Sequence, residues 1–200
     1  LGQAQRTLVR SISGMQKEPL VTDSVSGKTW RLVSDEGEYL DGDDVAPAPL
    51  AFMTTGMVSS FANELLALAE ERGIDVDDVT LVQDNYYTMN GSALRGTMTG
   101  GALPVELSVE VDSDAEESTL RELVETATRT SPVNGLMTSV LNSAFTLRLN
   151  GEAVPIEDGD DLGDESVEDP ASVFDDLVYD ADAQDRPIIH RTGRKTEPLP

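Results

Sequence analysis

The segment 50–72 constrains the fold most, because it contains no proline and only one glycine, Gly56. Its larger apolar residues recur at helical spacing, at Met53, Met57, Phe61, Leu65 and Leu68. Gly73 follows as a suitable C-terminal cap. We predict one long, largely buried helix, since apolar residues occupy too many of its sides for a lone surface helix. Gly56 could let a substrate or a neighbouring element approach the helix, but we favour its interpretation as a packing glycine.

Alternating apolar and polar residues predict several strands around this helix. They lie at 5–13, 21–24, 29–33, 79–89, 92–99, 103–111 and 145–149. Ser26-Gly27 predicts a turn in the first group, which reads as a meander. Asn90-Gly91 is the strongest hairpin signal in the chain, so the strands on its two sides are predicted to pair through it. Asn150-Gly151 closes the last strand.

Two further helices are expected at 114–129 and 132–142. Ser113 or Asp114 caps the first of these, and Pro132 suits the first position of the second. Together these elements predict an α+β fold in a domain of residues 1–150.

Residues 151–200 differ in character, with fifteen Asp or Glu against four Lys or Arg. We expect an acidic, partly disordered extension. Residues 172–179 could form one short helix in it. The run 158–165 partly imitates a calcium loop, but apolar Leu162 stands at its fifth position, so we interpret it as a solvated acidic run and expect no metal.

The net charge of −24 excludes several classes of partner. Such a surface repels phosphate backbones and anionic lipids, so neither nucleic acid nor membrane is expected as a partner. No run approaches the length of a membrane helix, and no signal segment indicates secretion. The chain has no cysteine. It therefore forms no disulfide, which favours a cytoplasmic location.

Two short motifs resemble the OsmC/Ohr family of hydroperoxide-detoxifying proteins. Residues 49–61 read PLAFMTTGMVSSF, similar to the family's Pro-Glu-x-Leu-x-x-Ala-Gly-x-x-x-Cys-Phe. Residues 131–134 read SPVN, similar to its Cys-Pro-Val/Tyr-Ser. The resemblance spans roughly residues 5–150. It implies a curved, mostly antiparallel sheet wrapped around a long central helix, in an intertwined homodimer with pockets at the subunit interface.

The departures from the family pattern bear on activity. The resemblance implies that Ser60 and Ser131 occupy the positions of the peroxide-attacking and resolving cysteines, and Leu50 that of the peroxide-binding glutamate. A serine hydroxyl is scarcely ionised at neutral pH and has no sulfenic state to cycle through. Thiol-dependent hydroperoxide reduction is therefore not expected, and no cofactor is expected either.

The family's partner arginine comes from the N-terminal strands and loops. Arg10, Lys17 and Arg31 are the candidates in this sequence.

Ser60 and Ser131 remain the candidate catalytic residues, with two interpretations. As a nucleophile, Ser60 needs a base, and the single histidine, His190, lies in the C-terminal extension. A lysine base, Lys17 or Lys28, has no support from the pattern. We favour the other interpretation, in which both serines are small polar residues that replace cysteine.

A pocket lined by Leu50, Met53, Met57, Phe61 and Met137 would be largely apolar and adaptable. Our leading hypothesis is a cysteine-less OsmC-like protein that binds or processes a small apolar or carbonyl-containing molecule. One alternative is a hydrolase or lyase that uses Ser60, lysine or an activated water. Another is an interaction module whose acidic extension engages a basic partner.

Overall fold

The computed structural model describes residues 4–139 and 146–155, and the chain divides into two compact units. One unit combines Leu1–Pro49 with Ala144–Pro200, and the other is Leu50–Ser143. Every pair of described strands is antiparallel, and the described residues form three α-helices and two short 3₁₀ helices. The α+β class predicted from the sequence is confirmed.

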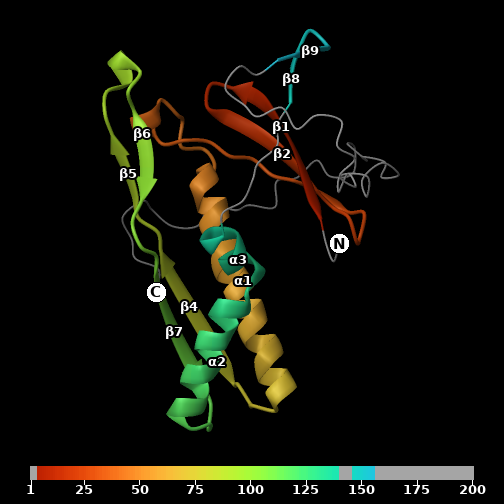
Figure 1. Cartoon of the computed structure of the whole chain (residues 1–200), viewed down its shortest axis with the longest axis vertical. Coiled ribbons are helices and arrows are strands. Elements are labelled where there is room, and N and C mark those ends of the chain that lie inside the picture. The colour runs from red at the N-terminus through yellow and green to blue at the C-terminus, as the bar shows by residue number, and fades with distance from the viewer. Residues whose placement is uncertain (1–3, 140–145, 156–200) are drawn as a thin grey trace. The chain divides into compact units, whose positions relative to one another are not determined.

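The N-terminal part of the first unit is a three-stranded sheet of β1 (Gln5–Ser13), β2 (Gln16–Asp23) and β3 (Thr29–Arg31), in that order (Figure 1). The predicted meander is thus confirmed, although β2 starts well before the predicted strand at 21–24. Gly27 has a φ of +66°, a conformation that glycine adopts without steric cost.

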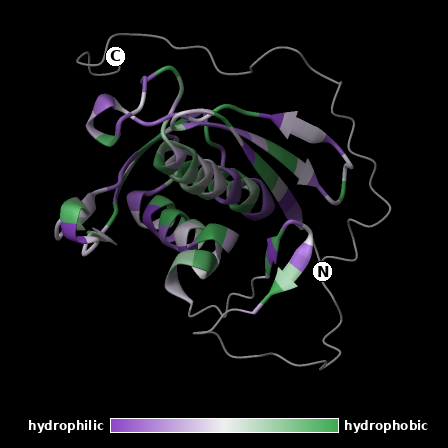
Figure 2. Cartoon of the chain, turned by 90° about the horizontal axis from the view of Figure 1, so that it is seen from above, coloured by the Kyte–Doolittle hydropathy of each residue, from purple (hydrophilic) through white to green (hydrophobic). Residues whose placement is uncertain are grey.

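The buried side chains of this sheet and its following loop are polar. They are Glu18, Thr22, Asp23, Ser34 and Asp35, while the buried apolar residues of the described chain all belong to the second unit. Bands of hydrophilic and hydrophobic residues succeed one another along the strands (Figure 2). The sheet therefore lacks an apolar core formed from its own fully buried residues.

Asp35 organises the acidic loop that follows β3 and contains η1 (Glu38–Leu40). Its Oδ2 accepts hydrogen bonds from the backbone N–H groups of Asp43, at 3.1 Å, and Val45, at 3.2 Å. Burial tends to raise the pKa of Asp35, but the backbone N–H groups of Val45, Glu36 and Asp43 outweigh it and hold that pKa below its ordinary value. The carboxylate thus folds the loop.

A second hairpin of the first unit joins β8 (Leu147–Leu149) to β9 (Glu152–Val154). Its two turn residues, Asn150 and Gly151, have φ values of +52° and +88°. Positive φ at both positions is typical of a type I′ turn. The predicted final strand is present, and Asn150-Gly151 leads into another strand.

The second unit begins with α1 (Pro49–Arg72). Its C-terminus has the predicted glycine cap: Gly73 has a φ of +64°, and its N–H donates to the carbonyl of Glu70. The N–H of Ile74 donates to the carbonyl of Ala69, which completes a Schellman motif. Ile74 also packs against the core.

The prediction that α1 is largely buried is wrong for the single chain. One stripe at four-residue spacing is buried: Met57, Phe61, Leu65 and Ala69. Leu50 and Leu66 are each 45% exposed, and Met53 is 39% exposed. Leu68 packs beside this stripe against the core, whereas Leu50, Met53 and Leu66 remain accessible.

α2 (Glu117–Thr130) and α3 (Pro132–Thr138) lie alongside α1 within this unit (Figure 1). Leu65 and Ala69 of α1 form the core with Leu123 and Ala127 of α2. Pro132 starts α3 as predicted.

The predicted cap of α2 is wrong, because the N-cap residue is Glu116, whose side chain makes no capping bond. The hydroxyl of Ser113 instead accepts from the N–H of Ala115, so Ser113 belongs to the preceding turn.

The strands of the second unit form two antiparallel pairs. β4 (Asp78–Asp84) pairs with β7 (Glu106–Asp112), and β5 (Tyr87–Asn90) pairs with β6 (Thr99–Ala102). The predicted strand at 79–89 is therefore interrupted after Asp84.

The predicted strand at 92–99 is wrong, because η2 (Ala93–Arg95) and a longer loop occupy most of that range. Gly91 lies so close to the Thr97 carbonyl that an added Cβ would stand 2.1 Å from its oxygen. The Asn90-Gly91 pair therefore opens a folded-back loop instead of a two-residue turn.

The predictions for residues 158–165, 172–179 and His190 lie outside the described residues. Within 4–139 and 146–155, no helix is long and apolar enough to cross a membrane.

Candidate functional site

The side chains of Ser60 and Ser131 meet within the second unit, although 71 positions separate them in the sequence. Their hydroxyl oxygens lie 2.7 Å apart and share a hydrogen bond. Ser60 lies on α1 and is half-buried, whereas Ser131 joins α2 to α3 and is only 1% exposed. The structure thus brings together the two residues that the sequence singled out.

The helix seam positions this pair. Ser131 continues the four-residue spacing of Leu123 and Ala127, the buried residues of α2. Its backbone N–H donates to the carbonyl of Ala127, at 3.1 Å. A second polar link lies nearby, where the hydroxyl of Thr130 donates to Glu64 Oε1 at 2.9 Å. The serine pair is therefore the polar end of an apolar helix–helix contact.

Met57 lies one helical turn before Ser60 and is 4% exposed. Its sulfur is the acceptor for two amide groups, Gln83 Nε2 at 3.6 Å and Asn85 Nδ2 at 3.7 Å. Gln83 Nε2 also donates to Asn85 Oδ1 at 2.8 Å, while Gln83 Oε1 is buried and has no hydrogen-bond partner among the residues that the structure describes. An unpaired buried carbonyl oxygen can accept a hydrogen bond from a ligand.

Gln83 and Asn85 were not among the site residues predicted from the sequence. The alternation along β4 could have indicated Gln83, because it shares a strand face with Val79 and Leu81, and these three partly buried residues alternate with exposed ones. Because Val79 packs against the core, the same strand face directs Gln83 toward the helices.

The remaining predicted pocket residues differ in burial. Phe61 is 6% exposed. Leu50, Met53 and Met137 are 45%, 39% and 47% exposed. The single chain therefore buries two of the five predicted pocket residues and leaves three accessible.

The chemistry available to Ser60 is limited by its partner. Another neutral hydroxyl cannot remove its proton in the way a histidine or lysine base does. Residues 4–139 and 146–155 contain no histidine. The same ranges hold no group of three or more acidic or histidine side chains arranged for a metal ion.

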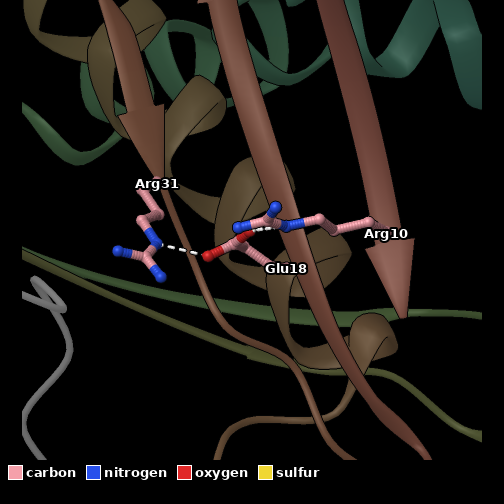
Figure 3. A network of polar contacts seen from close by, with 3 residues as sticks. All are labelled: Arg10, Glu18 and Arg31. Atoms are coloured by element: carbon pink, nitrogen blue, oxygen red, sulfur yellow. Dashed lines mark hydrogen bonds and ion pairs between the residues drawn. The ribbon is translucent and has the colours of Figure 1, made fainter. Parts of the chain in front are cut away.

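The three candidates for the family's arginine lie in the first unit. Arg10 of β1 and Arg31 of β3 both form ion pairs with Glu18 of β2 (Figure 3). Lys17 precedes Glu18 on β2 and is paired with Ser11, so its side chain lies on the face of the sheet opposite Glu18. The structure brings two of the candidates to one carboxylate, in the unit that does not contain Ser60.

Solved structures share this fold. An OsmC-like hydroperoxide resistance protein from Jannaschia sp. CCS1 is 16% identical, with a TM-score of 0.50, over 76% of this chain and 95% of that one. An OsmC-like protein from Mycoplasma pneumoniae is 12% identical, with a TM-score of 0.51, over 70% and 89% of the two chains. At these identities the likeness concerns the fold alone.

The sequence comparisons point to the same family. No curated protein matches the sequence. The family described as OsmC-like protein matches residues 41–143, which is just over half of the 200-residue chain. This range contains α1, α2 and α3, and therefore both serines of the candidate site. The chain belongs to the OsmC-like protein family, as its two motifs indicated, and its 200 residues contain no cysteine.

Proposed function

We propose that this protein is a ligand-binding member of its family that has lost thiol chemistry. It binds a small apolar or carbonyl-containing molecule and does not reduce hydroperoxides through thiols. The observation that carries the proposal is the 2.7 Å contact between the Ser60 and Ser131 hydroxyls. The resemblance places a reactive cysteine pair at these positions, whereas two serines there form a neutral hydrogen bond without redox capacity.

The surroundings of this pair favour binding over catalysis. In the proposed pocket, Met57 and Phe61 would supply buried apolar surface, and Met53 and Met137 would supply accessible, flexible thioethers. Gln83 and Asn85 supply amide groups beside Met57. An apolar wall with a few polar groups is typical of small-molecule sites, and the amides would bind a carbonyl or hydroxyl group.

We further propose a homodimer with the pocket at its interface. The family resemblance implies this assembly, and exposure in the single chain supports it. Leu50, Met53 and Leu66 are 39–45% exposed on one helix. The N-terminal sheet also has Val9, on the face opposite Leu8 and Arg10, more than half exposed, and it has no fully buried apolar residue among those described. A partner chain would cover such surfaces.

Other parts of the hypothesis rest on composition. The net charge of −24 supports the absence of nucleic-acid and membrane partners. The lack of cysteine supports a cytoplasmic location. A division into an OsmC-like domain of residues 1–150 and an acidic extension of 151–200 follows from the charge asymmetry.

Methyl NMR tests the binding proposal, with 2-octanone as an apolar carbonyl probe. The chain has six methionines, so a sample labelled at methionine methyl groups gives few signals. We expect 2-octanone to shift Met53, Met57 and Met137 in a saturable way. Met15 lies in the turn after β1 and is the internal control. Unshifted site methionines, or equal shifts at Met15, would refute the proposed pocket.

A peroxidase assay tests the loss of thiol chemistry. The wild-type chain should not turn over cumene hydroperoxide with dithiothreitol. The double variant Ser60→Cys/Ser131→Cys is the matched comparison, because its two thiols would occupy positions already in contact. Robust turnover by the wild-type chain would contradict the proposal.

A further inference from the structure

The carboxylate of Glu18 lies at the centre of the N-terminal sheet face and is almost completely buried. Its residue is 1% exposed. Arg10 Nε pairs with Glu18 Oε2, and Arg31 Nε pairs with Glu18 Oε1, from the strands on either side (Figure 3). One glutamate therefore binds two arginines.

The way in which these arginines are bound leaves donors for another partner. Each arginine donates to Glu18 through its Nε. Among the described residues, the terminal nitrogens Nη1 and Nη2 of Arg10 and Arg31 make no further hydrogen bond or ion pair. The side chains of Arg10 and Arg31 are 68% and 43% exposed. A guanidinium group has five N–H donors in a rigid plane, so the terminal N–H groups can bind an anion.

The register of the sheet shows what else lies on this face. Arg10 is opposite Glu18, and Leu8 is opposite Leu20, two residues along each strand. Arg31 is opposite Leu20 on the other side of β2. Residues two apart on a strand share a face. The two guanidinium groups therefore adjoin an apolar cross-strand pair, in which Leu8 is 55% exposed.

The charge of this face is opposite to that of the chain as a whole. Within the paired registers of the three strands, Arg10 and Arg31 share the face with a single acid, Glu18. Remote acids are screened over about 8 Å at physiological salt, so the local charge decides what binds in contact. The net charge of −24 nevertheless disfavours an extended polyanion.

We propose that Arg10 and Arg31, positioned by Glu18, bind the carboxylate of a small amphiphilic acid whose apolar part lies on Leu8 and Leu20. The bidentate match between guanidinium and carboxylate supplies the specificity for the head group. Because Glu18 already fixes both side chains, less conformational entropy is lost on binding. The site belongs to the first unit and does not depend on the function proposed for Ser60 and Ser131.

The test uses the full-length chain and octanoate as the probe, with octan-1-ol and inorganic phosphate as comparisons. Calorimetry should show that octanoate binds at least about tenfold more tightly than either, since only octanoate has both parts of the proposed ligand. In the wild-type chain, the Nε–Hε NMR signals of Arg10 and Arg31 should shift with octanoate. This readout needs no variant, so it does not depend on the folding of one.

Single variants assign the site. Arg10→Gln and Arg31→Gln should each weaken octanoate binding about tenfold. Arg121→Gln is the matched control, because it removes the same charge from an exposed pair with Glu117 in the other unit. Its affinity should stay within about twofold of the wild type.

Four results would overturn the proposal. If octan-1-ol bound as tightly as octanoate, the carboxylate would not be recognised. If phosphate bound as tightly as octanoate, the apolar part of octanoate would not be recognised. An equal loss in Arg121→Gln would show that only net charge matters. Absence of saturable octanoate binding, with unshifted arginine signals, would also reject the site.

Discussion

The hydrogen bond between Ser60 and Ser131 predicts an asymmetry between two alanine substitutions. Ser60→Ala removes the partner of Ser131, whose residue is 1% exposed. The stranded hydroxyl cannot reach water, so we expect a loss of about 2 kcal/mol in the free energy of unfolding, within the range for a buried unpaired polar group.

Ser131→Ala strands the other hydroxyl instead. Ser60 is half-buried and can turn its hydroxyl toward solvent. The expected loss is then about 1 kcal/mol, the net contribution of a typical hydrogen bond. The double variant removes both hydroxyls, so its loss should fall short of the sum of the single losses by about 1 kcal/mol.

Urea unfolding, followed by far-ultraviolet circular dichroism, measures these differences. The described helices run from Pro49 to Thr138, so this signal reports mainly on the second unit. The chain's single tryptophan, Trp30, lies on β3, and its fluorescence reports on the N-terminal sheet. At a slope of about 2 kcal/mol/M, Ser60→Ala should lower the midpoint by about 1 M and Ser131→Ala by about half as much.

The comparison between the losses in unfolding free energy of the two single variants tests the reasoning. A loss in Ser131→Ala equal to or greater than that in Ser60→Ala would refute the reasoning, because the burial difference would then have no energetic effect. Additive losses in the double variant would show that the two hydroxyls are not coupled. Either result would remove the structural basis for treating the pair as an unreactive contact.

Two other predictions concern the core and the sheet. Leu123 is fully buried, so Leu123→Ala should lower the free energy of unfolding, measured in urea, by about 2–5 kcal/mol. The control Leu66→Ala, at a position 45% exposed, should lower it by about 0.5 kcal/mol. Similar losses in the two variants would contradict the assigned core. The hydrogen bond from Arg10 lowers the pKa of Glu18 by more than burial raises it, so the pKa is below its ordinary value in the folded chain. The ionised Glu18 therefore stabilises the folded chain at pH values above the ordinary glutamate pKa of about 4.3. This stabilisation is lost as the pH falls through the lower pKa of the folded state. Glu18→Gln should therefore be less stable than the wild type at neutral pH, by about 1 kcal/mol. Unfolding followed by Trp30 fluorescence should show that this difference vanishes in acid. A difference that persists undiminished in acid would contradict the ion-pair account.

Local sequence signals predicted those elements whose stability is largely local. The α1 pattern and its Gly73 cap depend on residues within a few positions of one another, and both are found in the structure. The motifs at 49–61 and 131–134 indicated the family that the comparisons show. The same signals did not determine how much of α1 a single chain buries.

The two Asn-Gly pairs show where local signals fail. Asn150 and Gly151 both have positive φ and form the turn between β8 and β9, as a two-residue hairpin requires. Asn90 is not among the described residues with positive φ, and Gly91 instead approaches the Thr97 carbonyl. The dipeptide is the same, and the surrounding chain decides which turn it forms.

The sequence by itself determined the family, the long helix with its cap, and the absence of cysteine from these 200 residues. Only the tertiary structure decided that Ser60 and Ser131 share a hydrogen bond in the described fold and that Glu18 is buried between two arginines. A glutamate in the run 16–20 carries no local mark of burial. Its environment comes from strand register across β1, β2 and β3, and register is set by packing between segments distant in sequence.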